Sequence, residues 1–135
     1  MNILTALRKK QIPQISKTFY PIPPSGLIAK TEKGYFYIKG KKKFKFISER
    51  AMKTWCLPII ETKEEKLAGF ATAGVLGLRD GTVAKDISDG KIYLISDSSR
   101  RHITNPDVLI WIKSSIIEVS QREILVHKDG EPLSE

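Results

Sequence analysis

Short apolar runs, separated by polar turns, divide residues 26–77 into a series of small elements. Four runs rich in β-branched and aromatic side chains predict strands, at residues 27–30, 35–38, 44–47 and 58–61. Between the last two strands, Ser48 is expected to open a helix that ends near Trp55. Thr62 and Glu65 have the T-x-x-E spacing of a capping box, which predicts a second short helix.

The same series of elements occurs a second time in the chain. Residues 34–55 align with residues 90–111 without a gap, and residues 26–30 align with residues 81–85 after one residue of slippage. An ordered series of this length indicates an internal duplication, in which each copy is too small to bury its apolar face alone.

The second copy carries the same helix signals as the first. Pro106 stands where the first residue of its first helix would lie, a position that suits proline. Ser120 and Glu123 repeat the capping-box spacing. We therefore expect an α+β fold of two tandem repeats, each a small antiparallel β-sheet with two short helices. The expected segments are an N-terminal arm at 1–25, a first repeat at 26–77 and a second repeat at 78–135.

The arm before the first repeat is expected to be extended. Residues 11–26 include four prolines, which fix the backbone angle φ and block helix formation. Apolar residues punctuate the arm and predict contacts with a neighbouring molecule, whereas the alternative is a disordered tail. The candidate contact residues of the arm are Ile12, Ile15, Phe19, Tyr20 and Ile22.

Matching aromatic residues in the two copies are the predicted anchors of the core. Tyr37 aligns with Tyr93, and Trp55 aligns with Trp111 at the ends of equivalent helices. Buried aromatic side chains contribute strongly to core stability. On this alignment, the substitution Trp111→Ala is expected to cost about 3–5 kcal/mol.

Charge is distributed unevenly along the chain. The net charge is +8, with +11 in residues 1–57 and −3 in residues 58–135. Such a distribution favours acidic protein neighbours, nucleic acid or head-to-tail contact between copies of the chain. The most basic segment is a predicted hairpin tip with Lys41, Lys42, Lys43 and Lys45. These lysines are candidates for contact with an acidic protein surface. The alternative is that lysines at a hairpin tip simply prevent edge-to-edge aggregation. Phe44 and Phe46 beside them are expected to be packed.

Sequence features for catalysis, cofactor binding and metal binding are not found. Arg100 and His102 lie on one face of a predicted strand, without a nucleophile or carboxylate motif to support a catalytic histidine. We interpret both as candidate contact residues, with a solvated strand as the alternative. His102 and His127 lack zinc-ligand spacing. No apolar run reaches the roughly 18 residues of a membrane span, and the single cysteine, Cys56, forms no internal disulfide.

The second copy resembles a short module found in structural proteins of tailed phages, especially phages of cyanobacteria, and in bacterial surface proteins. The resemblance is carried by the segments 81–85, 92–95, 100–103, 105–108 and 130–133, with Ser120 and Glu123. It implies a non-enzymatic virion protein of the capsid, neck or tail, made in the host cytoplasm. Its implied partners are other virion proteins, in multiple copies of a symmetric assembly, with no membrane and no cofactor. The alternative function is a small module that binds a cell-envelope polymer or nucleic acid through its basic face.

Overall fold

The computed structural model describes residues 22–112 and 115–134. Within these residues the protein is mostly β, with ten strands, three short α-helices and one 3-10 helix. The prediction of an α+β fold with antiparallel sheets and two helices in each repeat is therefore wrong. The strands instead form two five-stranded mixed sheets.

The first sheet has the strand order β4-β1-β2-β3-β5. Its members are β1 (Ile28–Thr31), β2 (Gly34–Lys39), β3 (Lys42–Phe46), β4 (Ile59–Glu61) and β5 (Ala71–Leu76). The three central strands pair antiparallel, but β4 runs parallel to β1 and β5 runs parallel to β3. The sheet is mixed because the chain makes a crossover, through α2 (Glu49–Thr54) or η2 (Glu64–Leu67), before it adds each edge strand.

The second sheet repeats this topology. Its members are β6 (Val83–Asp86), β7 (Ile92–Ser96), β8 (Ser99–His102), β9 (Ile116–Val119) and β10 (Lys128–Asp129). The strand order is β10-β8-β7-β6-β9, in which β9 runs parallel to β6 and β10 runs parallel to β8. Its crossovers pass through α3 (Val108–Trp111) and α4 (Gln121–Leu125). Each strand of the first sheet therefore has a counterpart in the second.

Strand register shows which residues of the two sheets are equivalent. Ile59 pairs with Ile28 of β1, and Ile116 pairs with Val83 of β6, so the identical Ile-Ile-Glu segments of β4 and β9 occupy the same position. From β2 onward, equivalent residues are 57 positions apart, as Ile59 and Ile116 are.

The alignment made from sequence is therefore shifted by one residue. Ala29 pairs with Phe36 and Ala84 pairs with Tyr93, so Tyr93 is equivalent to Phe36 and not to Tyr37. The β1–β2 turn closes on the pair Thr31 and Gly34, whereas the β6–β7 turn contains two residues more. The sequence alignment had allowed only one.

This shift explains why one predicted core anchor is wrong. Trp111 is 80% exposed and lies at the position of Thr54, while the counterpart of Trp55 is Ile112. Ile112 packs against the cluster of Val83, Ile103 and Val108, just as Trp55 packs against Ile28, Phe46 and Met52. The other three predicted anchors lie within the fold: Tyr37 and Trp55 are partly buried and Tyr93 is buried.

The two capping-box predictions have different outcomes. Ser120 caps α4 in a complete capping box with Glu123, which confirms the prediction for the second copy. In the first copy the prediction is wrong, because η2 is a 3-10 helix capped by Lys63, whose side chain makes no capping hydrogen bond. Lys63 is the counterpart of Ser120 at the corrected register and offers no side-chain oxygen to the backbone N–H groups.

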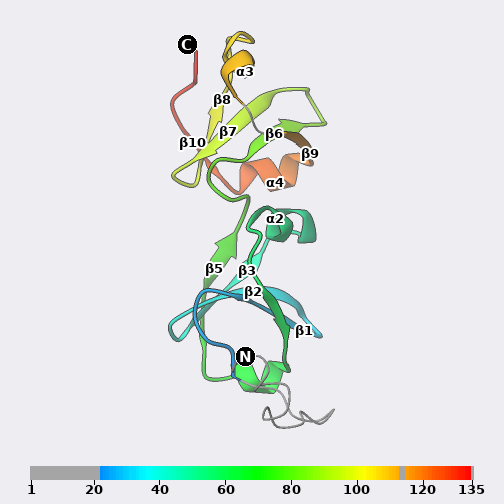
Figure 1. Ribbon diagram of the computed structural model, residues 1–135, viewed down its shortest axis with the longest axis vertical. Coiled ribbons are helices and arrows are strands. Elements are labelled where there is room, and N and C mark those ends of the chain that lie inside the picture. The colour runs from blue at the N-terminus through cyan, green and yellow to red at the C-terminus, as the bar shows by residue number, and fades with distance from the viewer. Residues whose placement is uncertain (1–21, 113–114, 135) are drawn as a thin grey trace, which may run out of the picture.

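The two sheets lie one above the other along the longest axis of the molecule, with α2 facing α4 between them (Figure 1). One apolar cluster joins the halves, because Ala51 of α2 and Leu78 pack with Tyr93, Ile95 and Ile124 of the second half. Ala51 and Ile95 are fully buried. The two copies therefore share a core instead of forming independent domains.

Four predicted contact residues of the arm, Ile12, Ile15, Phe19 and Tyr20, lie outside the described residues. Ile22 is described and its side chain is 64% exposed. The described part of the arm, residues 22–25, contains no strand or helix.

Candidate interaction surfaces

The lysines of the predicted hairpin tip differ in their exposure to solvent. Lys42 and Lys45 of β3, and Lys41 before it, are exposed. Lys43 is half-buried, with its Nζ 3.9 Å from Glu64 Oε1 and 5.2 Å from the centre of the Phe36 ring. Lys43 is therefore engaged in contacts within the chain and is less accessible to a partner than its neighbours.

The aromatic residues between these lysines are packed, as predicted. Phe46 is buried beside Ile28 and Met52, and Phe44 is partly buried with its ring 6.1 Å from that of Tyr37. Neither ring is displayed among the exposed lysines, where it could stack on a nucleic-acid base.

Arg100 and His102 lie on the face of the second sheet that carries Tyr93. The Arg100 guanidinium donates a hydrogen bond to the backbone oxygen of His127 and lies 3.7 Å from Asp129 Oδ1. The His102 ring is half-buried, with its centre 5.4 Å from that of Tyr93. Arg100 thus stabilises the end of the chain around β10, a role that its position in the sequence did not indicate.

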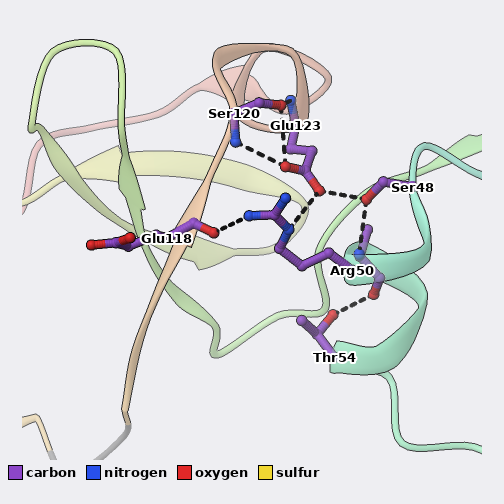
Figure 2. A network of polar contacts seen from close by, with 7 residues as sticks. Ser48, Arg50, Thr54, Glu118, Ser120 and Glu123 are labelled. Carbon is purple, nitrogen blue, oxygen red and sulfur yellow. Dashed lines mark hydrogen bonds and ion pairs between the residues drawn. The ribbon is translucent and has the colours of Figure 1, made fainter.

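The junction between the two halves contains a polar network centred on Glu123 (Figure 2). Glu123 Oε1 accepts a hydrogen bond from the Ser120 N–H at 2.8 Å, and Oε2 accepts one from the Ser48 hydroxyl at 2.5 Å. Arg50 Nε lies 3.5 Å from Glu123 Oε2, and its guanidinium donates to the backbone oxygen of Glu118. Ser48 also caps α2 by accepting from the Ala51 N–H. One carboxylate therefore links the starts of two helices from different copies.

The electrostatic environment keeps Glu123 ionised. Burial alone raises the pKa of this carboxyl. Hydrogen bonds from Ser120 and Ser48 and the charge of Arg50 lower the pKa by more than burial raises it, so the pKa lies below its usual value. Sequence reasoning identified Glu123 as a helix cap but not as the contact between copies, since nothing in the sequence pairs it with Ser48 or Arg50.

His127 forms a second contact across the junction. Its Nε2 accepts a hydrogen bond from the Leu78 N–H at 2.9 Å, so its Nδ1 carries the proton and donates to the Ser98 carbonyl at 2.7 Å. Burial lowers the pKa of the ring, although the hydrogen bond to Ser98 opposes this effect. Gly77 lies against the ring so closely that an added Cβ would be 2.5 Å from Nε2. A cavity of about 270 Å³ beside this contact is lined partly by Trp55, Arg79 and His127.

The outer end of the second half presents an apolar surface. Ile110 and Trp111 are adjacent on α3 and are 75% and 80% exposed. At the equivalent positions of α2 the chain has Lys53, which is paired with Glu49, and Thr54, which accepts a hydrogen bond from the Arg79 N–H. The second copy therefore exposes large apolar side chains where the first has polar ones.

The described residues contain no cluster of three or more His, Cys, Asp or Glu side chains placed to bind a metal ion. Among the helices of these same residues, none has the length and apolar character required to span a membrane. Comparison of the chain with protein-family models, curated proteins and solved structures finds no match.

Proposed function

We propose that this protein is a non-enzymatic structural component of a tailed-phage virion, which acts by protein–protein contacts. The observation that carries the proposal is the exposed pair Ile110 and Trp111 on α3. Tryptophan is enriched in protein interfaces, where its large surface contributes more binding energy than most other residues do. An exposed pair of this kind marks a contact surface more strongly than apolar residues scattered singly over a protein.

The virion assignment is supported by the sequence resemblance. The segments that resemble the phage module fall mainly on β6, β7, β8 and the turn that leads into α3, so they cover the sheet and helix that support Trp111. The exposed lysines of the first half extend the surface available to an acidic protein neighbour.

The experiment is a quantitative measurement of the protein in purified particles. Particles of the phage that carries the gene are purified by density gradient, and the amount of this chain is measured by mass spectrometry relative to the major capsid protein. We expect a constant ratio between preparations that corresponds to several copies per particle. Absence of the chain, or a ratio that falls with each purification step, contradicts the proposal.

Matched variants test whether α3 makes the contact. Trp111→Ala should reduce incorporation, whereas Leu125→Ala, which removes a 58% exposed side chain from α4, should not. Duplex and single-stranded DNA are tested in parallel at about 150 mM salt. Submicromolar binding to DNA that is lost when Lys41 and Lys42 are neutralised would support the nucleic-acid function instead.

A further inference from the structure

We propose that the α3 surface, formed by Asp107, Ile110 and Trp111, binds a second copy of this chain. The contact between chains would resemble the contact that α2 makes with the second half within one chain. This inference deepens the proposed function, on which it rests, by naming the partner. Within the chain, the outer face of α2 packs on α4 and the sheet of the following copy. At the equivalent positions of α3, Asp107 and Trp111 are exposed, and no described residue covers them. The first half of another chain can cover them, because it has the same topology as the half that receives α2.

The charges at the equivalent positions are complementary with reversed sign. The internal contact joins Arg50 of α2 to Glu123 of α4. At the corrected register, the counterpart of Arg50 is Asp107 and the counterpart of Glu123 is Lys66. Asp107 is exposed, Lys66 is half-buried, and neither forms an ion pair with the described residues. Repetition of the internal contact between two chains would therefore place Asp107 of one against Lys66 of the next.

The apolar residues are complementary in the same way. Inside the chain, Thr54 of α2 contacts the backbone of Arg79, just before the second sheet. Gly26 and Gly81 donate to the equivalent carbonyls of Ile38 and Ile95, so the segment that precedes Gly26 is equivalent to the segment that precedes Gly81.

In that first-half segment, Pro24 occupies the place of Arg79, and Pro24 and the neighbouring Ile22 are exposed. Trp111, the counterpart of Thr54, would meet these apolar side chains where the internal contact is polar. The charged pair and the contact of Trp111 with Pro24 thus both favour binding between chains, whereas the apolar cluster around Ala51 is not repeated, because its counterpart Val108 is buried in its own half.

The overall charge distribution favours the same orientation. A head-to-tail contact brings the second repeat of one chain, where residues 78–135 have 8 Lys/Arg and 10 Asp/Glu, against the first repeat of the next, where residues 26–77 have 11 Lys/Arg and 5 Asp/Glu. Because the two contacting surfaces differ, the contact is heterologous and leaves a free surface at each end. Such contacts form rings if the rotation closes and filaments if it does not.

The test is charge-reversal complementation, measured by sedimentation over a series of protein concentrations. Asp107→Arg and Lys66→Glu are each expected to weaken self-association by about tenfold, because each creates a pair of like charges at the interface. An equimolar mixture of the two variants should associate like the wild type, since every contact in alternating chains then joins unlike charges. Trp111→Ala should weaken association by at least about tenfold, and the exposed control Lys91→Glu should leave it unchanged.

The outcomes separate this inference from the proposed function. If the wild type is monomeric at all concentrations, or if the mixture fails to restore association, the second copy is not the partner. Particle incorporation that depends on Trp111 would then assign the α3 surface to another virion protein, and the proposed function would stand. Complementation in solution by a chain that is absent from particles would support the self-association and overturn the virion assignment.

Discussion

Replacement of Glu123 by alanine removes the group that joins the two copies. The carboxylate is 2% exposed and accepts hydrogen bonds from Ser120 and Ser48 while it lies beside Arg50. The Ser120 cap itself remains, because its hydroxyl accepts from the backbone N–H of residue 123. The buried donors that lose their acceptor cost about 1–3 kcal/mol. The ion pair itself adds at most about 1 kcal/mol, because the Arg50 side chain is 51% exposed.

We therefore expect Glu123→Ala to lower the free energy of unfolding by roughly 1–3 kcal/mol, mainly from the unsatisfied donors. The measurement is urea unfolding followed by circular dichroism at neutral pH. The matched control is Glu49→Ala, which breaks an exposed pair with Lys53 and should cost less than about 0.5 kcal/mol.

The dependence on pH distinguishes the carboxylate from mere packing. The folded protein lowers the pKa of Glu123 below the unfolded value of about 4.5, so its stabilising contribution is complete above pH 4.5 and is lost as the pH falls through the folded pKa. The difference in stability between wild type and Glu123→Gln should therefore shrink on acidification below pH 4.5. A Glu123→Ala variant within 0.5 kcal/mol of the wild type, or a difference independent of pH, would refute this description of the junction.

Three further predictions concern the same part of the molecule. Trp55→Ala should destabilise the fold by about 3 kcal/mol, because the indole packs on Tyr37 and Phe46 and donates to the Gly77 carbonyl. Trp111→Ala should leave the melting temperature unchanged, and equal effects of the two variants would contradict the corrected alignment of the two copies. Because burial lowers the pKa of His127, its stabilising contribution is complete above pH 6.5 and is lost as the pH falls from there toward the lower folded pKa; urea titrations should show this loss in the wild type and not in His127→Gln. Gly77→Ala should cost about 1–3 kcal/mol through collision with His127, while Gly69→Ala, with no atom within 4 Å of the added Cβ, should be neutral or slightly stabilising; thermal unfolding of the two variants compares them directly.

Sequence reasoning located strands with strong apolar patterns but missed one edge strand of each sheet, β5 and β10. The segments at 35–38 and 58–61 predicted β2 and β4 because their side chains are large and β-branched or aromatic. β5 was missed because its residues are small and mostly exposed, a pattern that does not distinguish an edge strand from a loop. β10 is only two residues long and was missed for a similar reason. The sheets are mixed because both edge strands of each run parallel to their neighbours, and strand patterns in the sequence do not show the direction of pairing.

The predicted core anchors depended on how the two copies were aligned, and matching identical residues gave an alignment shifted by one residue. The matches Tyr37 with Tyr93 and Trp55 with Trp111 were attractive because aromatic identities are rare. The burial of Phe36 and Ile38, which corresponds to that of Tyr93 and Ile95, shows the true equivalence. Identity of side chains was therefore a weaker guide than the face of the strand on which each lies.

Direct detection of the pair Asp107 and Lys66 between chains tests the central claim, that one contact operates both within and between chains. Equal amounts of unlabelled and ¹⁵N-labelled protein are mixed and treated with a carbodiimide, which joins a carboxylate to an amine only when the two are in contact. Mass spectrometry then identifies the linked peptides and their isotopic composition. The pair Lys53 and Glu49, 3.6 Å apart in one chain, provides the internal control and should give only links of uniform isotope. We predict a link between Asp107 and Lys66 that contains both isotopes. Formation of the control link without any mixed-isotope link between Asp107 and Lys66 would contradict the claim.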